Sequence, residues 1–253
     1  MERRRRREGV TALVAPGMER RGVLAAFTER RGGVSSGPYR TLNLGFRTGD
    51  RPERVVENRR RAARALGVPP FALARQVHGR GVVRIGPRRA GAGFDAPAGI
   101  LGPADALVTA RPGTPVAVLV ADCVPVVLAD GGTVAVVHAG WRGIAAGILQ
   151  RAAALLPDGG AAAIGPAIGP CHYEVGEDVA AAVDAATGNR ARVERRAGRA
   201  FLDLPRTAEA VLRDAGIAEV ERADDCTACH PDRFFSYRRD GRSGRQAGVA
   251  MLL

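Results

Sequence analysis

The sequence contains no lysine and few aromatic residues. All 38 basic residues among its 253 are arginines, against 26 acidic residues, and the net charge is +12. The arginines are spread over most of the chain, and only 4% of the residues are aromatic. A nucleic-acid-binding surface favours a basic stripe with interleaved aromatic side chains. We therefore attribute the charge to compositional bias and predict no nucleic-acid partner.

Long apolar runs are also missing. No stretch approaches the roughly 20 consecutive apolar residues that cross a membrane. The arginine run at residues 3–7 has no apolar segment behind it. Four cysteines are too few for the disulfide framework of a small secreted domain. We therefore predict a cytoplasmic protein with reduced thiols, no membrane partner, and a disordered, arginine-rich tail over residues 1–20.

The rest of the chain is long enough for one large core, because 46% of the residues are apolar and 25% are charged. Three valine-rich runs, 116–120, 125–128 and 134–137, are continuous, which is typical of strands buried on both faces. Residues 21–253 are therefore predicted to form a single mixed α/β domain, with a large, mostly buried β-sheet flanked by helices.

The other elements follow from apolar periodicity and from glycine and proline breakers. Helices are predicted over residues 52–66, 144–156, 177–186 and 205–215. Strands are predicted over residues 22–27, 105–109, 161–164, 217–221 and 247–252. Residues 71–78 and 82–85 are predicted to form a short strand pair.

Residues 130–133, Asp-Gly-Gly-Thr, predict a tight turn, because glycine supplies the positive φ angles that hairpin turns need. With the two glycines as the turn residues, Pro125 pairs with His138. Cys123 lies two residues before Pro125, so it points to the same face as His138, roughly 7 Å away along the diagonal. A four-residue loop preserves this pairing, whereas a three-residue loop reverses it.

A metal site is one use for these side chains. His78 ends another predicted strand, from which it can complete a site with Cys123 and His138. One thiolate and two imidazoles suit zinc, and three protein ligands leave the fourth tetrahedral position for water or substrate, as in catalytic zinc sites. Zinc lowers the pKa of such a water to about 7.

Other interpretations of the same residues stay open. Cys123 can pack as a small buried hydrophobe while His138 bonds to backbone carbonyls. Cys123 can also act as a nucleophile with His138 as its base, as in cysteine hydrolases. Asp122 can orient a histidine, take part in acid-base chemistry, or hydrogen-bond the backbone.

The remaining cysteines give a weaker pattern. Cys226 and Cys229 form Cys-Thr-Ala-Cys with His230 adjacent, which superficially resembles a zinc knuckle or a redox dithiol. No second cysteine pair stands at zinc-finger spacing, and Cys171 and His172 lie much earlier, in a different predicted loop. We therefore interpret these residues as parts of plain loops and leave His172 out of the metal site.

Several ordered blocks of the sequence together resemble the YfiH-like family, also called the polyphenol oxidase or laccase-domain family and the peptidoglycan-editing-factor family. The blocks span most of the chain, so a chance resemblance is excluded. They are residues 31–39, 42–45, 49–50, 57–59, 76–79, 104–109, 121–125, 138–143, 168–171, 173–176, 235–239 and 244–245.

The resemblance implies a function and a ligand set. In this family the residues that match His78, Cys123 and His138 are the zinc ligands. The implied activity is phosphorolysis of purine nucleosides such as adenosine, inosine and methylthioadenosine, with adenosine deamination also attributed. The expected partners are thus a purine nucleoside and phosphate, and the catalytic residues are expected to be these three ligands together with Asp122.

Two further activities belong to the older names of the family. Copper-dependent oxidation of polyphenols needs many histidine ligands, and this chain has four histidines in total, so copper is less favoured than zinc. Peptidoglycan editing would use Cys123 and His138 as a hydrolase or amidase. Phosphorolysis instead needs an anion pocket, for which Arg142 and the backbone of Gly140 and Gly143, at a predicted helix start, are the candidate donors.

Overall fold

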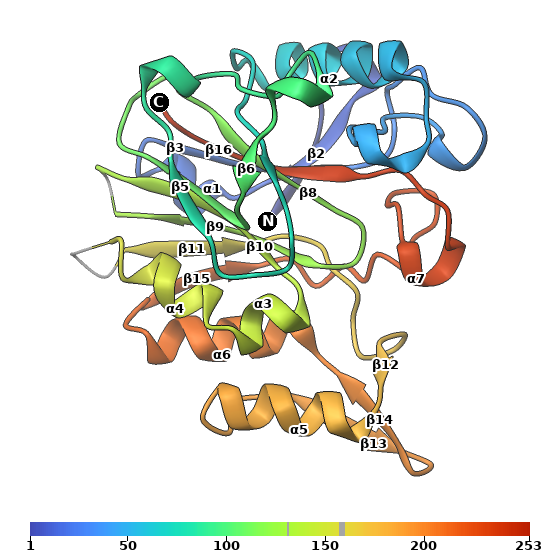
Figure 1. Cartoon of the computed structure of the whole chain (residues 1–253), viewed down its shortest axis with the longest axis vertical. Coiled ribbons are helices and arrows are strands. Elements are labelled where there is room, and N and C mark those ends of the chain that lie inside the picture. The colour runs from blue at the N-terminus through green and yellow to red at the C-terminus, as the bar shows by residue number, and fades with distance from the viewer. Residues whose placement is uncertain (131, 157–159) are drawn as a thin grey trace.

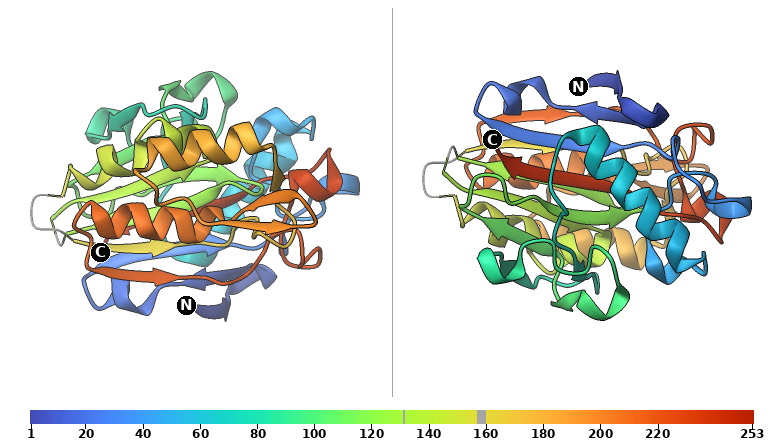
Figure 2. Two further views of the ribbon diagram at one scale, coloured as in Figure 1. Left: turned by 90° about the horizontal axis from the view of Figure 1, so that it is seen from below. Right: turned by 90° about the horizontal axis from the view of Figure 1, so that it is seen from above.

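Two large β-sheets are stacked face to face, and helices cover both outer faces (Figures 1 and 2). The structure is a computed structural model that describes residues 1–130, 132–156 and 160–253. One outer layer is helix α2 (Pro52–Leu66), which packs on the five-stranded sheet. The other outer layer contains α3 (Trp141–Ala145), α4 (Ile148–Ala153) and α6 (Leu204–Asp214), which pack on the six-stranded sheet.

The five-stranded sheet has the order β1-β2-β3-β16-β8, and all its neighbouring strands are antiparallel. Its strands are β1 (Glu2–Arg5), β2 (Thr11–Val14), β3 (Val23–Thr28), β8 (Val116–Val120) and β16 (Gln246–Leu252). The six-stranded sheet has the order β15-β11-β9-β10-β7-β5, with parallel pairs at both edges and antiparallel pairs inside. Its strands are β5 (Val82–Arg84), β7 (Ala106–Thr109), β9 (Val124–Ala129), β10 (Val134–Ala139), β11 (Ala161–Ile164) and β15 (Glu219–Arg222).

Smaller elements complete the fold. A three-stranded sheet and helix α5 (Glu177–Ala186) lie farthest from α2 (Figure 1). That sheet contains β12 (Glu174–Val175), β14 (Arg199–Leu202) and β13 (Val193–Arg196), and a parallel pair contains β4 (Ala74–Arg75) and β6 (Leu101–Pro103). The short helices are α1 (Pro16–Glu19), α7 (Tyr237–Asp240), and the 3₁₀ turns η1 (Arg7–Gly9), η2 (Gly37–Tyr39), η3 (Phe46–Thr48), η4 (Pro87–Arg89) and η5 (Pro97–Gly99).

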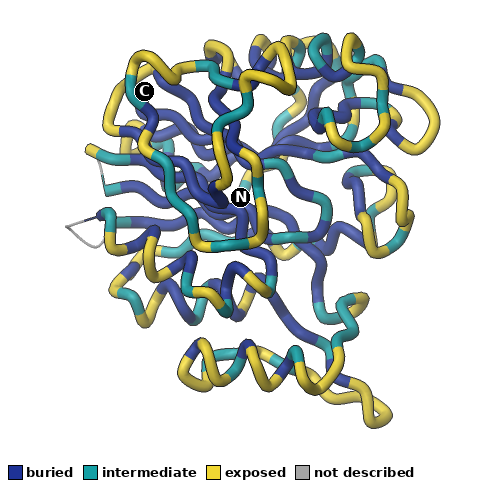
Figure 3. The backbone as a smooth tube through the Cα atoms, in the orientation of Figure 1, coloured by how far each residue is buried: buried dark blue, intermediate teal, exposed yellow. Residues whose placement is uncertain are grey.

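The continuous apolar runs reflect strands that are buried on both faces. In β9, Val126 and Leu128 belong to the core beneath α3, α4 and α6, whereas Val127 and Ala129 belong to the core between the sheets. Side chains alternate along a strand, so a strand between two apolar layers leaves no position for a polar residue. Figure 3 shows these central strands as buried and the outer faces of the helices as exposed.

The predicted mixed α/β single domain is confirmed, and the predicted bounds of α2 and α5 agree with the structure. The strands form two large sheets instead of the single one predicted. The chain passes from one sheet to the other between β8 and β9. Among the described parts of the chain, no helix combines the length and apolar character needed to cross a membrane.

Several local predictions were wrong. The helix predicted over 144–156 is two helices, α3 and α4, because Gly147 adopts a left-handed φ of 83° between them. Residues 71–78 and 82–85 do not pair with each other, since β4 pairs with β6 and β5 pairs with β7. The hairpin of β13 and β14, which turns at Ala197 and Gly198 with positive φ, was not predicted.

The prediction of a disordered tail was also wrong. Residues 2–5 form β1, which pairs with β2 at the edge of the five-stranded sheet. The Arg3 guanidinium donates two hydrogen bonds, of 2.7 and 2.8 Å, to the buried Glu29 carboxylate. Arg4 makes a similar pair with Glu19, at 2.6 and 2.8 Å. Bidentate pairing of this kind orders the segment that its charge alone predicts to be solvated.

The double-sided burial of β9 can be tested with Leu128→Ala. The side chain of Leu128 is fully buried beneath the helical layer, so its removal leaves a cavity. We expect the free energy of unfolding to fall by about 2–5 kcal/mol in urea denaturation. The matched control is Leu253→Ala, because Leu253 is 65% exposed, and its effect should stay within about 0.5 kcal/mol. Equal, small effects of both substitutions would contradict the layered core.

Candidate metal centre

Cys123 lies where the chain passes from one large sheet to the other. β8 ends at Val120 in the five-stranded sheet, and β9 begins at Val124 in the six-stranded sheet. His138 is the penultimate residue of β10, and the pairing of β9 with β10 places it opposite Pro125, as predicted. The hairpin thus brings Cys123 and His138 to the same end of the two sheets.

The predicted turn is consistent with this register. The Asp130 N–H donates to the Thr133 carbonyl at 3.2 Å, and the Asp130 carboxylate accepts from the N–H groups of Gly132 and Thr133. Gly131, the other predicted turn residue, lies outside the described residues.

His78 lies in a loop that folds around the carboxylate of Asp105. The N–H groups of His78 and Gly79 donate to the two Asp105 oxygens at 2.9 and 2.8 Å, and the Val77 N–H lies 3.2 Å from both oxygens. His78 takes a left-handed φ of 57° in this loop. A non-glycine residue holds that conformation only where its surroundings fix it, and here three hydrogen bonds to one buried carboxylate do so.

Gln76, two residues before His78, connects the His78 loop to β8. Its side-chain amide accepts from the Leu119 N–H at 2.8 Å and donates to the Leu119 carbonyl at 2.7 Å. The amide therefore substitutes for a neighbouring strand at the end of β8, next to the segment that carries Cys123. This pair of bonds and the Asp105 carboxylate together place His78 beside the β8–β9 junction.

The side chains of His78, Cys123 and His138 converge. Their ligand atoms all lie within 4.8 Å of one another, and the Cys123 Sγ is 3.7 Å from the His78 Nε2. The two imidazole rings meet edge to face, with 4.7 Å between their centroids. His138 is buried, Cys123 is half-buried and His78 is exposed, so the cluster is open on the His78 side.

Asp105 also orients the buried histidine. Its Oδ1 lies 2.8 Å from the His138 Nδ1, and a carboxylate can only accept there, so the Nδ1 carries the proton. Once its proton leaves, the Nε2 of His138 can bind a metal, as in many carboxylate–histidine–metal arrangements. Burial raises the pKa of Asp105, but the hydrogen bonds from His138 and the Gly79 N–H outweigh it and hold that pKa below its usual value.

Charges within the metal-free cluster shift two further pKa values. Burial raises the pKa of Cys123, but the charge and hydrogen bonds of His138, together with His78, lower it to about 6. Burial lowers the pKa of His138, but the Cys123 thiolate and the Asp105 carboxylate raise it to about 9. The cluster therefore favours a thiolate at neutral pH, which is the form of cysteine that binds metals.

Gly140 and Gly143 permit this packing. A Cβ on Gly140 would lie 2.9 Å from the His78 Cδ2 and 3.0 Å from the Cys123 Sγ, and a Cβ on Gly143 would lie 3.3 Å from the Gly79 carbonyl oxygen. Gly140 caps the start of α3, whereas Gly143 is buried within the helix. Arg142 is exposed, and its guanidinium lies 4.3 Å above the ring of Trp141.

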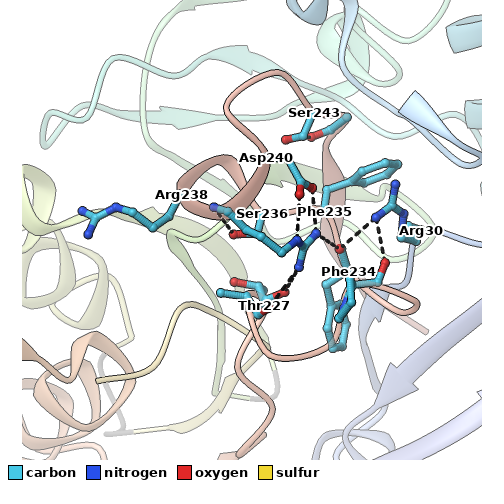
Figure 4. A network of polar contacts seen from close by, with 12 residues as sticks. Arg30, Thr227, Phe234, Phe235, Ser236, Arg238, Asp240 and Ser243 are labelled. Atoms are coloured by element: carbon cyan, nitrogen blue, oxygen red, sulfur yellow. Dashed lines mark hydrogen bonds and ion pairs between the residues drawn. The ribbon is translucent and has the colours of Figure 1, made fainter. Parts of the chain in front are cut away.

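Asp122 is bound to other partners. It is buried with a left-handed φ of 92°, and its carboxylate accepts from the Thr227 hydroxyl at 2.6 Å and from the Arg238 N–H at 2.7 Å. Asp105, and not Asp122, orients the histidine. Thr227 and Arg238 lie in the polar network of the C-terminal segment shown in Figure 4.

Three residues that the sequence left without a role interact with Cys123 through charge or with one another. Burial raises the pKa of Tyr173 to about 12, with Cys123 adding to the effect and Arg238 and Arg142 opposing it. The guanidinium of Arg238 lies 4.8 Å from the Tyr173 ring centroid. Burial lowers the pKa of Arg245, and Cys123 opposes that shift. The contact of Arg238 with Tyr173 links loops distant in sequence, so residue spacing could not reveal it.

The structure joins the other cysteines as well. Cys171 and His172, predicted to lie in a separate loop, are adjacent to Cys226 and Cys229, and their ligand atoms lie within 4.8 Å of one another. The neighbouring His230 points elsewhere, with its Nε2 3.8 Å from Asp225. The interpretation of these residues as unrelated loops is therefore corrected.

The His78 cluster fits a metal ion by its own chemistry. It supplies one thiolate and two imidazoles, it leaves one side open, and Gly140 removes the side chain that would crowd the two ligands. The fold and the site thus define a mixed α/β protein with a Cys-His₂ cluster that can hold a metal.

Residues 24–253 match the family described as multi-copper polyphenol oxidoreductase laccase. The chain belongs to this family, which is the YfiH family of the sequence resemblance. It is 43% identical over 255 aligned positions to a purine nucleoside phosphorylase of Deinococcus radiodurans, covering 96% of this chain and 94% of that one. It is 37% identical over 240 positions to the purine nucleoside phosphorylase YfiH of Escherichia coli K12, covering 92% and 95%.

Solved structures give the same result. YlmD from Geobacillus stearothermophilus superposes with a TM-score of 0.86 at 33% identity, covering 94% of both chains. A hypothetical protein YfiH from Bacillus licheniformis superposes with a TM-score of 0.87 at 29% identity, covering 96% of both chains.

The close approach at Gly140 can be tested with Gly140→Ala. The added methyl must displace His78 or Cys123, so we expect zinc affinity at this cluster to fall about tenfold or more. The measurement is a zinc competition titration with a chelator, following the binding step that Cys123→Ala abolishes. The matched control is Gly86→Ala, because a Cβ there has open space. Unchanged affinity in Gly140→Ala would contradict the geometry.

The role of Asp105 can be tested with Asp105→Asn in the same titration. The substitution keeps the size of the side chain but sets an amide against four N–H groups, so we expect zinc affinity to fall about 10- to 100-fold. Loss of these buried hydrogen bonds should also lower the free energy of unfolding by about 1–3 kcal/mol. Asp95→Asn is the control, since Asp95 is 60% exposed and pairs with Arg60, away from the cluster. Equal zinc affinity in Asp105→Asn and Asp95→Asn would show that Asp105 does not support metal binding.

Proposed function

We propose that the protein is a zinc-dependent purine nucleoside phosphorylase with adenosine deaminase activity. The observation that carries the proposal is the open cluster of His78, Cys123 and His138 in a chain whose relatives of nearly the same length are named purine nucleoside phosphorylase. The proposed substrates are adenosine, inosine and methylthioadenosine, together with phosphate. Zinc is favoured over copper because multicopper oxidation needs many histidine ligands and this chain has four histidines.

The three ligands have distinct positions in this proposal. His138 is held from behind by Asp105 and binds through Nε2, and Cys123 binds as the thiolate. His78, on the open side, borders the space from which substrate enters. When bound, zinc would supply a Lewis acid that polarises a water or a substrate atom at neutral pH.

Phosphorolysis requires a site for phosphate. A phosphate oxygen bonds to C1′ of the ribose as the bond from C1′ to the purine nitrogen breaks, and the released base takes up a proton. Arg142 is exposed at the start of α3, where Gly140 and Gly143 leave backbone N–H groups close to the cluster. We infer that these groups bind the phosphate dianion, because guanidinium and first-turn N–H groups both favour anions.

Asp122 is proposed as a positioning residue. Its carboxylate joins Thr227 to Arg238 immediately beside Cys123. Arg238 in turn lies against Tyr173. Asp122 thereby positions Arg238 beside the site. Its described contacts do not include either histidine.

A cysteine hydrolase or amidase acting on cell-wall precursors is the second candidate. The order Cys123, His138, Asp105 follows a nucleophile, a base and the group that orients the base. In that case Cys123 would form an acyl adduct with the substrate and no phosphate would be required.

Product analysis by mass spectrometry separates these functions. Zinc-loaded protein given adenosine and phosphate is expected to yield adenine and ribose 1-phosphate only when phosphate is present, and inosine with or without phosphate. Cys123→Ala is expected to lose at least about 100-fold in both rates, because it removes a ligand. His230→Ala is the control and should retain both activities, because His230 lies outside the cluster, with its Nε2 3.8 Å from Asp225.

The Arg142→Ala variant tests the proposed phosphate site separately from deamination. It should raise the KM for phosphate while the rate of inosine formation stays within about twofold, since deamination needs no phosphate. Adenosine left untouched by the zinc-loaded wild type would contradict the nucleoside proposal. An acyl adduct on Cys123 with cell-wall precursors would instead support the hydrolase.

A further inference from the structure

A second cluster of metal-binding side chains lies on the loop after β11 and on the turn at 226–229. The Cys171 Sγ is 3.4 Å from the Cys229 Sγ, and the His172 Nδ1 is 3.5 Å from the Cys229 Sγ and 4.0 Å from the Cys226 Sγ. All four ligand atoms lie within 4.8 Å of one another.

These spacings match one tetrahedral site. Zinc bonds of about 2.3 Å to sulfur and about 2.0–2.1 Å to nitrogen place the ligand atoms of a tetrahedral site roughly 3.5–3.8 Å apart. The three distances given above, from 3.4 to 4.0 Å, lie close to that range. Small side-chain rotations would bring all four atoms around one ion.

The backbone already holds the two loops in place. Residues Ala167 and Cys226 form a parallel bridge, and the Thr227 N–H donates to the Ala167 carbonyl at 2.9 Å. The Gly169 N–H donates to the Cys226 Sγ at 3.2 Å. An N–H group directed at sulfur is the environment that stabilises a thiolate ligand, because it supplies positive charge to the sulfur.

We propose that Cys171, His172, Cys226 and Cys229 bind a structural zinc ion, distinct from the metal at His78, Cys123 and His138. Four protein ligands of the Cys₃His type close the coordination sphere, which is the pattern of structural zinc sites. His172 binds through Nδ1, the atom that faces Cys226 and Cys229.

A disulfide explains the cluster less well. Joining Cys171 to Cys229 would require their sulfurs to approach from 3.4 Å to about 2.05 Å. It would use two of the four groups and leave His172 and Cys226 facing the bond without a role. Convergence of all four ligand atoms is what a metal ion requires.

The second site would stabilise the first one. Thr227, inside the Cys-Thr-Ala-Cys turn, holds the carboxylate of Asp122, and the Ile168 N–H donates to the Asp122 carbonyl at 2.9 Å. Asp122 precedes Cys123 in the chain. An ion that clamps the two loops therefore fixes the backbone beside Cys123 from a distance, without touching substrate.

The test is the zinc content of the full chain, purified under reducing conditions and dialysed against trace zinc, measured by mass spectrometry of the metal. We expect about two zinc ions per chain in the wild type and about one in the Cys171→Ser, Cys229→Ser double variant. Both cysteines are exposed, so the variant should fold. His230→Ala is the matched control and should keep both ions, because it removes a neighbouring histidine outside the cluster.

Cobalt substitution identifies which ion is lost. Three thiolates give stronger sulfur-to-cobalt charge-transfer absorption than one, so the double variant should lose most of that band while Cys123→Ala loses the smaller part. A single zinc ion that disappears in Cys123→Ala, or a mass lower by two hydrogen atoms that shows a Cys171–Cys229 disulfide, would overturn the proposal. A single ion that persists in Cys123→Ala and disappears in the double variant would support it and would remove zinc from the proposed catalytic site.

Discussion

The buried carboxylate of Asp105 is the contact on which the candidate metal centre depends. It binds three consecutive N–H groups of the His78 loop and the Nδ1 of His138. A buried carboxylate is stable only when such donors satisfy it, so the loop and the end of β10 are held at one point. The two histidines meet there because they share this anion, although they are 60 positions apart.

The stacking of the two sheets supplies the third ligand. β8 and β9 lie in different sheets, and the short crossing between them carries Cys123 to the same edge as His138. Gly140 lets the next element, α3, begin directly behind the ligands. The site therefore requires both a rigid double-sheet core and a residue without a side chain at the point of closest approach.

Part of this arrangement could be predicted from the sequence, since a two-glycine turn and side-chain alternation determine the register that brings Cys123 and His138 together. The place of His78 could not be predicted, because it depends on a left-handed loop around a carboxylate 27 residues later. The roles of Asp105, Tyr173 and the Cys171 cluster could not be predicted either, because they too depend on contacts between segments far apart in the sequence. The ordering of the first strand was missed because its arginines pair with acidic residues far along the chain.

Anomalous diffraction from crystals of the zinc-loaded protein, collected above and below the zinc absorption edge, tests the metal centre most directly. We expect an anomalous peak about 2.0–2.1 Å from the Nε2 atoms of His78 and His138 and about 2.3 Å from the Sγ of Cys123. A map with these three side chains ordered and no zinc peak between them would contradict a metal centre and leave Cys123 as a nucleophile.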